Sequence, residues 1–327
     1  MKSVPICHKR TLKCSVLIDI TSFCNNTLSC GRRCRFFSSV LPESHPFNSS
    51  PKISPPVYHG ETRSVPMKLL HHIQMKNKDH QHELANTLRP YFQSRTPYLL
   101  RHLYCNSDAI YYWKSLEYWR VAVGNHTNVE VEVGKTYNIS ERITMKFGDY
   151  LDYLSLCIEQ DSNESTDTAA EEVAYLAQNE LFPQVMDDIE IPSLCCEPNA
   201  SYNIGQGKLY HTMLWMGPRN TVSPLHYDPL DNLLIQVTGW KRVLLFPASK
   251  TTELQQWHYG GADGNQYNTS AVDIESPDNE KYPNFTLFAP IPFECVLGPG
   301  DALYIPKRWW HHVRSLEFSV STNIWWR

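Results

Sequence analysis

The sequence predicts a mainly β fold, a barrel or a jelly roll, with helices ahead of it. From Lys208 onward, short apolar runs alternate with turn-forming residues, which is typical of strands that wrap around one core. The composition agrees, because aromatic residues make up 12% of the chain and 22 Pro outnumber 14 Gly, a mix that favours strands and stiff connections over helix bundles. The expected strands cover 209–216, 232–237, 242–247, 293–297, 302–305 and 318–326.

The region ahead of these strands is predicted to mix helices with strands. The apolar pattern over 67–88 predicts a helix that ends at Pro90. Residues 128–133 alternate apolar and charged side chains, which is typical of a half-buried strand. The other expected elements are a strand at 96–101, an aromatic amphipathic helix at 109–123, a helix at 145–158, a polar loop at 161–168 and a strand or short helix at 171–180.

The first 42 residues differ from the rest of the chain in composition. They hold seven basic residues against a single acidic one, Asp19, among many Ser and Thr. That profile is typical of an organellar transit peptide, and the stretch RRCRFFSS at 32–39 resembles the sites where mitochondrial presequences are cut. A disordered basic tail or a misassigned start codon explains the composition equally well. Nuclear, cytoplasmic and mitochondrial locations therefore all stay open.

Composition also divides the chain into three expected parts. Residues 1–65 form a basic segment rich in Cys, Ser and Pro, and from residue 43 onward it has the make-up of a linker. We expect 66–170 to be an extension of helices and strands that packs on the core, and 171–327 to be the core itself.

Charge and hydropathy limit the classes of function. The net charge of −4 gives no general attraction to nucleic acid, so we do not expect nucleic acid as the direct substrate. No apolar run is long enough to span a bilayer, and no membrane association is expected. The ten cysteines are expected to be reduced thiols, because a chain of 327 residues needs no disulfide framework.

Two possible metal ligands lie close together in the stretch 214–246. His226 and Asp228 stand two residues apart, so in a strand both side chains point to one face. An imidazole beside a carboxylate supplies two of the three ligands of the facial triad that holds non-haem Fe(II). Alone, such a pair is a weak signal, because a histidine on a strand is more often a hydrogen-bonded structural residue than a ligand.

A third ligand is available near the C-terminus. A strand-like run, GDALYIP at 300–306, leads directly to the adjacent His311 and His312. In a regular strand only one of these two side chains faces the interior. Lys241 lies on the strand that follows the His-x-Asp pair, where its amino group could reach the far end of a dicarboxylic co-substrate.

Longer stretches of the sequence carry a family resemblance from about residue 90 to 327. They are WKSLEY (113–118), VEVGKTY (131–137), YLAQ (175–178), LF (181–182), DIEIP (188–192), GP (217–218), TVSPLHYDP (221–229), DIESPD (273–278), IPKRWWHHVR (305–314) and WW (325–326). Together they resemble the JmjC-domain family of Fe(II)/2-oxoglutarate oxygenases, and within it the branch that is described both as lysine demethylases and as arginyl hydroxylases. The resemblance implies the family's fold, a cupin-like double-stranded β-helix (a jelly roll), here with flanking N-terminal helices.

The resemblance also implies roles for single residues. His226, Asp228 and His311 match the metal ligands, and His311 is preferred to His312 because the family's histidine follows a Trp and precedes x-Val-Arg. Lys241 matches the residue that pairs with the distal carboxylate of 2-oxoglutarate. Other positions that match the co-substrate pocket are Tyr137, Ser223 and Asn232, with Trp215 and Trp310 as its walls. The aromatic residues among them could equally be packing residues, and Asn232 a turn residue.

The implied chemistry uses Fe(II), 2-oxoglutarate and O2. 2-Oxoglutarate is converted to succinate and CO2 while one oxygen atom is inserted into a substrate C–H bond. We expect a protein or peptide substrate, with arginine as the modified residue. Its guanidinium could meet acidic and aromatic side chains ahead of the core, namely Glu117, Glu130, Glu132 and Trp113, although Trp113 could equally be a core residue and the glutamates a solvated strand face.

Two other functions stay open. A histone lysine demethylase would use the same cofactors, and a JmjC-like scaffold would keep the fold without turnover. The complete ligand set and Lys241 count against the scaffold. The C-terminal 324–327 could form either a buried last strand or a homodimer contact.

Overall fold

The computed structural model of the protein describes residues 50–51, 61–134, 141–163, 173–198, 202–250, 268–283, 285 and 290–327. Most of the basic N-terminal segment, Tyr137 and the larger part of the expected polar loop, 164–168, lie outside these residues.

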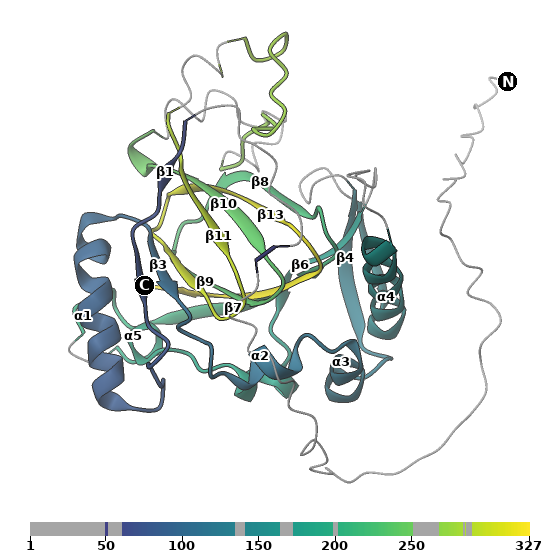
Figure 1. The fold of residues 1–327 in the computed structure, drawn as a ribbon, viewed down its shortest axis with the longest axis horizontal. Coiled ribbons are helices and arrows are strands. Elements are labelled where there is room, and N and C mark those ends of the chain that lie inside the picture. The colour runs from purple at the N-terminus through teal and green to yellow at the C-terminus, as the bar shows by residue number, and fades with distance from the viewer. Residues whose placement is uncertain are drawn as a thin grey trace, which may run out of the picture. The chain divides into compact units, whose positions relative to one another are not determined.

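Eight consecutive strands, β7 to β14, build two sheets that face each other (Figure 1). The larger sheet contains the order β12-β9-β14-β7, and the smaller sheet contains β11-β10-β13-β8. The chain changes sheet after almost every strand, which is the winding of a double-stranded β-helix. This confirms the predicted fold class. The strands are β7 (Leu209–Gly217), β8 (Val222–Tyr227), β9 (Asp231–Thr238), β10 (Lys241–Phe246), β11 (Phe293–Leu297), β12 (Ala302–Ile305), β13 (Trp310–Ser315) and β14 (Ser319–Trp326).

Both sheets continue beyond these eight strands. In the larger sheet β2 and β3 lie beyond β12, and β6, β4 and β5 lie beyond β7; in the smaller sheet β1 pairs with β11. Strands from both sides of residue 170 thus share one sheet, and the expected domain boundary there stays a prediction. The added strands are β1 (Arg63–Ser64), β2 (Met67–Leu69), β3 (Tyr98–Arg101), β4 (Asn128–Gly134), β5 (Glu141–Lys146) and β6 (Val173–Glu180).

The helix predicted at 67–88 is confirmed only over 78–88, and it does not end at Pro90. The structure has strand β2 at its start and helix α1 (Lys78–Ser94) beyond it. Asn77 begins the helix, because its side chain accepts hydrogen bonds from the backbone N–H groups of Asp79 and His80. Pro90 lies inside the helix on its exposed face, where the carbonyl group that it leaves unpaired can meet water.

The other helices differ from expectation mainly at their ends. The single helix expected at 109–123 is two helices, α2 (Asp108–Tyr112) and α3 (Leu116–Val123), because the Ser115 side chain caps α3 by accepting from the backbone N–H of Tyr118. Helix α4 runs over Phe147–Asn163, after strand β5, and so takes in the start of the expected polar loop. Of the two alternatives at 171–180, the strand is confirmed as β6. The short elements are α5 (Ser193–Cys196), η2 (Pro183–Asp188) and η3 (Ala248–Lys250).

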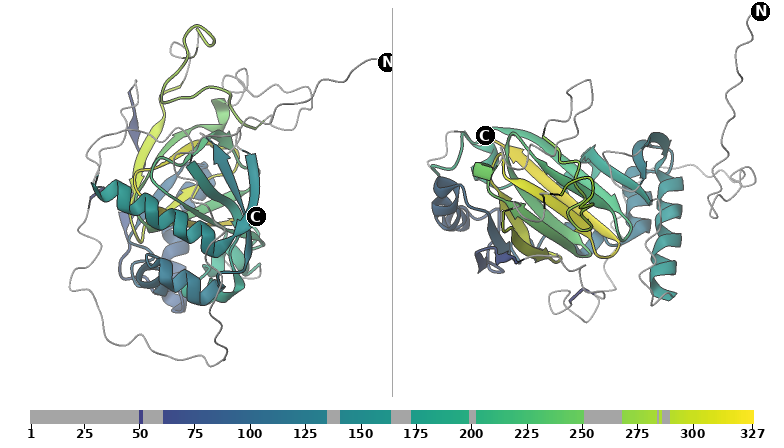
Figure 2. Two further views of the ribbon diagram at one scale, coloured as in Figure 1. Left: turned by 90° about the vertical axis from the view of Figure 1, so that its right-hand side faces the viewer. Right: turned by 90° about the horizontal axis from the view of Figure 1, so that it is seen from above.

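Apolar packing occupies both faces of the larger sheet. On the outer face of this sheet, apolar side chains pack with those of the helices. In Figure 1, α1 and α4 lie at the two opposite ends of the row of strands. Helix α4 also packs against α3 (Figure 2). Between the two sheets a second cluster, which includes Leu234, Val243 and Ile305, fills part of the interior. The remainder of that interior holds polar side chains. No helix in the described part of the chain is long and apolar enough to cross a lipid bilayer.

Candidate active site

Strands β8 and β13 bring two histidines together. His226 and His311 are register partners, and their ring centroids are 4.2 Å apart. The next pair along the ladder is Val313 with Ser223, two residues on from His311 but three residues from His226. Strand β8 therefore holds one more residue than β13 over this interval. The extra residue makes a β-bulge, which lets Ser223 and His226 face the same interior although three positions separate them.

Asp228 completes a cluster of three possible metal ligands. One side-chain atom from each of His226, Asp228 and His311 lies within 4.8 Å of the other two. The Asp228 carboxylate oxygens are 4.0 Å from His226 Nε2 and 3.7 Å from His311 Nε2. His312, the adjacent histidine, points to the opposite face of β13, as strand alternation requires. The structure therefore brings together the three residues that the sequence predicts.

Hydrogen bonds orient both histidine rings. His226 Nδ1 donates to the carbonyl of Pro224 at 2.7 Å, and His311 Nδ1 donates to the carbonyl of Trp309 at 3.0 Å. A proton on Nδ1 leaves the lone pair on Nε2, the atom nearer to Asp228. Burial lowers the pKa of His311 to about 4, and the neighbouring His226 adds to the effect. The ring is therefore neutral at pH 7, the state in which imidazole binds a metal.

This donor set fits Fe(II). Two neutral imidazoles and one carboxylate on one side of a cavity match the facial triad of non-haem iron sites, which leaves positions for other ligands. Asn232 adds a second sign of a bound group. Its Nδ2 donates to Asp228 at 3.5 Å, while its buried Oδ1 has no hydrogen-bond partner among the described residues. A buried acceptor of this kind is normally satisfied by a ligand or an ordered water.

A cavity opens from the three ligands into the space between the sheets. It encloses about 420 Å³ of empty space, including its mouth. Its lining residues are Tyr175, Gln178, Trp215, Ser223, His226, Asp228, Asn232, Leu234, Lys241, Ile305, His311, Val313, Asn323 and Trp325. Ser223, Asn232, Trp215 and Lys241 thus lie where the sequence predicts a co-substrate pocket.

Lys241 is a buried cation in this cavity. Its side chain is 2% exposed, and Nζ donates to the hydroxyl of Tyr175 at 3.3 Å. No carboxylate of the described residues forms an ion pair with it, and burial lowers its pKa to about 7. An amino group without a counter-charge in a largely dry cavity favours an anionic ligand.

Trp310 does not reach the cavity. It packs on the opposite face of the smaller sheet against Leu225, Tyr227 and Phe246. Because His311 faces the interior, the neighbouring Trp310 must face outward. The expectation that Trp310 walls the pocket is therefore not supported by its position, and it is a packing residue. Tyr137 lies outside the described residues.

Several cavity residues were not expected from the sequence. Tyr175 is the most informative, because its hydroxyl contacts Lys241 and also takes part in a hydrogen bond with Ser223. Burial raises the pKa of Tyr175, so its hydroxyl stays protonated. Asn323 and Trp325 reach the cavity from β14. The sequence held a pattern that could have identified these two residues, since both alternate along β14 with the apolar residues that face the helices.

A segment outside the smaller sheet holds the edge strand β8. Residues 268–270 pair with it beside His226: Ser270 N donates to Leu225 O at 2.7 Å, and Tyr227 N donates to Asn268 O at 3.0 Å. Further along the same segment, Glu275 is buried among cations of β10 and β13. It accepts from Arg314 Nε at 2.6 Å, and its other oxygen lies 3.6 Å from Arg242 Nη1. The segment therefore supports the ligand-bearing strands from behind.

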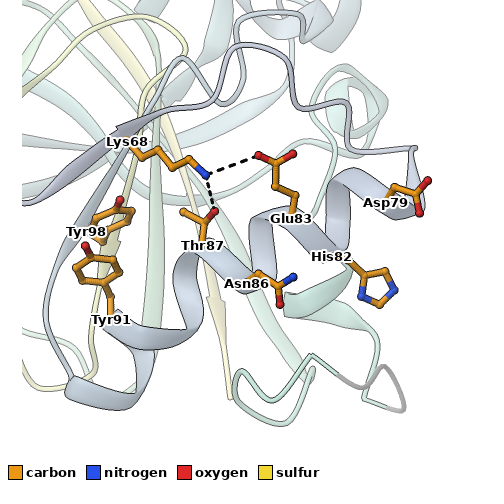
Figure 3. Close-up of a pocket in the computed structure, with 8 residues that line it drawn as sticks. All are labelled: Lys68, Asp79, His82, Glu83, Asn86, Thr87, Tyr91 and Tyr98. Atoms are coloured by element: carbon orange, nitrogen blue, oxygen red, sulfur yellow. Dashed lines mark hydrogen bonds and ion pairs between the residues drawn. The ribbon is translucent and has the colours of Figure 1, made fainter.

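A wider hollow lies elsewhere, between β2 and α1 (Figure 3), and encloses about 1170 Å³. Lys68 reaches across it toward Glu83, at 3.7 Å, and donates to Thr87 at 3.1 Å. It is an open surface, Lys68 and Glu83 on it are paired with each other, and among the described residues no set of possible metal ligands converges on it. Size alone therefore does not identify it as the functional site.

Comparison with known proteins agrees with this geometry. A family model described as "Cupin-like domain" matches residues 84–327. The chain is 35% identical over 248 residues to the lysine-specific demethylase JMJ30 of Arabidopsis thaliana, covering 74% of this chain and 52% of that protein. It is 38% identical over 217 residues to lysine-specific demethylase 8 of Danio rerio (65% and 48%), and 35% over 239 residues to Jumonji C domain-containing protein 5 of Drosophila melanogaster (72% and 55%).

The chain spans about half the length of these curated relatives. The family's cofactors are Fe(II), 2-oxoglutarate and O2, which suit the His–Asp–His cluster. Because the family model covers more than half of the chain and the similarity runs through both ligand-bearing strands, the chain belongs to the cupin-like JmjC family of Fe(II)- and 2-oxoglutarate-dependent oxygenases.

Proposed function

We propose that this protein is an oxygenase that hydroxylates a protein side chain, with arginine as the modified residue. The observation that carries the proposal is Lys241, a buried amino group that has no counter-charge among the described residues and shares one cavity with the three possible metal ligands. A 2-oxoglutarate molecule would supply the missing anion, and its co-substrate role requires that it also lie next to the iron.

Each residue then has a defined task. His226, Asp228 and His311 would hold the iron, which together with 2-oxoglutarate and O2 supplies the oxidising power for the C–H bond. Lys241 would bind the distal carboxylate with a charge-assisted hydrogen bond. The hydroxyl of Tyr175 accepts from that amino group and is itself hydrogen-bonded with Ser223, which keeps the amino group oriented.

A cationic substrate is favoured by an acidic hollow beside the cavity. This hollow encloses about 540 Å³ and is lined by Asn128, Glu130, Glu132, Arg142, Ala177, Gln178, Asn179 and Glu180. Gln178 lines both spaces. Glu132 is buried and already binds a guanidinium, that of Arg142, so the hollow can accommodate the group that an arginine substrate would bring.

The other two expected substrate contacts are not at this hollow. Trp113 is fully buried among the helices, and its indole N–H donates to Asp188 at 2.8 Å. Glu117 lies on the exposed face of α3 and pairs with Arg120. For Trp113 the alternative of a core residue is therefore the better interpretation.

Lysine demethylation is the second candidate, favoured by the names of two of the relatives. Its substrate is also a cation, and Tyr175, Trp215 and Trp325 supply aromatic faces for a methylated ammonium. The intact ligand set and the buried lysine count against a silent scaffold.

Mass spectrometry of a peptide panel tests the proposal. Arginine peptides and methyl-lysine peptides would be incubated with the protein, Fe(II), ascorbate and 2-oxoglutarate, with a His226→Ala protein as control. We expect the arginine peptides to gain one oxygen atom only with the unaltered protein. Loss of a methyl group from the lysine peptides, with the arginine peptides unchanged, would instead establish the demethylase.

A further inference from the structure

Arg142 covers a buried carboxylate from outside. Arg142 on β5 and Glu132 on β4 are register partners, so their side chains lie on one face of the sheet. The guanidinium donates from Nε and Nη2 to the same oxygen of Glu132, at 3.0 and 2.8 Å. The Glu132 side chain is 3% exposed, whereas that of Arg142 is 58% exposed. A largely exposed cation thus satisfies an acid that water hardly reaches.

Glu132 connects this surface arginine to the cavity. On the side of β4 away from β5, Glu132 pairs in register with Tyr175 on β6. The negative charge of Glu132 adds to the effect of burial in raising the pKa of Tyr175. The Tyr175 hydroxyl in turn accepts from Lys241. Arg142, Glu132, Tyr175 and Lys241 therefore form a line of polar groups that runs from the surface to the proposed co-substrate site.

We propose that Arg142 is an internal competitor for the substrate's cationic side chain at Glu132. The inference rests on the proposed function, because it assumes a cationic substrate that pairs with Glu132. An ion pair with one exposed partner contributes little to stability, so the Arg142 guanidinium can leave. A buried carboxylate without a cation is costly, so Arg142 leaves only as another cation arrives.

Glu132 favours arginine over methylated lysine in this exchange. An incoming guanidinium can remake both hydrogen bonds that Arg142 gives up, because it presents the same planar fork. A methylated ammonium has fewer donors and no fork, so it cannot replace what it displaces. Arg142 thus weakens the binding of both cations by the same factor, because the cost of displacing it does not depend on which cation arrives, and the preference for arginine comes from Glu132 itself.

The variant Arg142→Gln tests the inference. It keeps an amide that can still donate to Glu132 but removes the positive charge. We expect the KM for an arginine peptide to fall about two- to fivefold, the ratio that loss of an exposed ion pair implies. The effect is read in the KM, because Arg142 lines the hollow proposed for the substrate and not the ligand cavity. A methyl-lysine peptide should gain by the same factor, because displacing Arg142 costs the same whichever cation arrives.

Three further variants serve as controls. Arg120→Gln removes another arginine that pairs with a carboxylate, that of Asp152, away from the hollow, and should leave the KM unchanged. Arg142→Lys keeps the charge without the fork and should lie between the unaltered protein and Arg142→Gln. In a Glu132→Gln protein the Arg142→Gln change should bring no gain. If Glu132→Gln does not fold, the comparison of the unaltered protein with Arg142→Lys and Arg142→Gln still tests the inference.

Binding measured without turnover separates the two proposals. The same arginine peptide is titrated by calorimetry into protein loaded with Mn(II) and 2-oxoglutarate in the absence of oxygen. If Arg142→Gln binds the peptide more tightly but no arginine peptide gains oxygen, the competitor inference stands and arginine hydroxylation fails. If Arg142→Gln binds the peptide no more tightly than the unaltered protein, the inference is overturned even where hydroxylation of arginine is seen.

Discussion

Lys241 should make the affinity for 2-oxoglutarate depend on pH. Burial holds the pKa of this amino group at about 7 in the free protein, against an ordinary value of 10.5. A carboxylate bound next to it favours the protonated form and raises the pKa again. At pH values between the free and the bound pKa, binding must therefore take up a proton. The affinity should fall above about pH 7, by up to about tenfold per pH unit.

The variant Lys241→Met isolates the effect of this one group. Methionine has a similar length and no charge, and loss of one partner of a buried ion pair costs about 3–5 kcal/mol. We therefore expect 2-oxoglutarate to bind at least about a hundredfold more weakly, with no pH dependence from this position. Without 2-oxoglutarate, and between about pH 7 and 10.5, Lys241 is protonated in the unfolded chain but neutral in the folded chain. The free energy of unfolding therefore rises with pH in this window, and the variant should lose this rise.

Calorimetry measures these quantities directly. 2-Oxoglutarate is titrated into protein loaded with Mn(II) at several pH values from about 7 to about 9, in buffers that differ in ionisation enthalpy, which gives the affinity and the number of protons taken up. An affinity that stays constant over this range in the unaltered protein would refute the reasoning. So would a Lys241→Met protein whose affinity remains within a few fold of normal.

Three other predictions follow from the same geometry. Asp228→Ala should abolish metal retention and the formation of succinate, measured by metal analysis and by succinate assay; substrate-dependent succinate from this variant would reject the ligand assignment. His311→Ala should lose the metal, whereas His312→Ala should retain it, because only His311 faces the interior; the same metal analysis distinguishes them. Glu275→Gln should lower the free energy of unfolding by about 3–5 kcal/mol, because it removes a buried carboxylate that pairs with Arg314 and Arg242, and among the described residues only Arg242 keeps another acid, Glu294. Denaturant unfolding, with Asp278→Asn in the same segment as the control, checks this, and equal stability of the two variants would contradict it.

Local patterns in the sequence were sufficient to place His226 and Asp228 side by side, whereas the choice of His311 as the third possible ligand needed the family resemblance. His226 and Asp228 share a face because two positions separate them in an extended chain, and Lys241 begins the next strand of the smaller sheet. The apolar runs after residue 208 predicted most strands of the core for the same reason, since period-two alternation is a property of the local backbone.

Features that depend on pairing between distant strands could not be predicted. The bulge that turns Ser223 toward the cavity exists only in the register of β8 against β13. The contact of Tyr175 with Lys241 joins β6 to β10, which are not neighbours in either sheet. The start of the helix expected at 67–88 was wrong for a different reason. An apolar pattern does not say where a helix begins, and the cap at Asn77 outweighed it.

The position of β14 has a consequence for biosynthesis. It is the last described strand in the sequence, yet it lies in the middle of the larger sheet, between β9 and β7. Roughly 80 residues separate the end of β9 from its start, so a ribosome working at about 5–20 residues per second needs several seconds to bridge them. During that time the finished β7 and β9 have no partner for the edges that β14 will join, and open edges invite pairing with other chains. The nascent protein should therefore depend on chaperones most strongly in this interval.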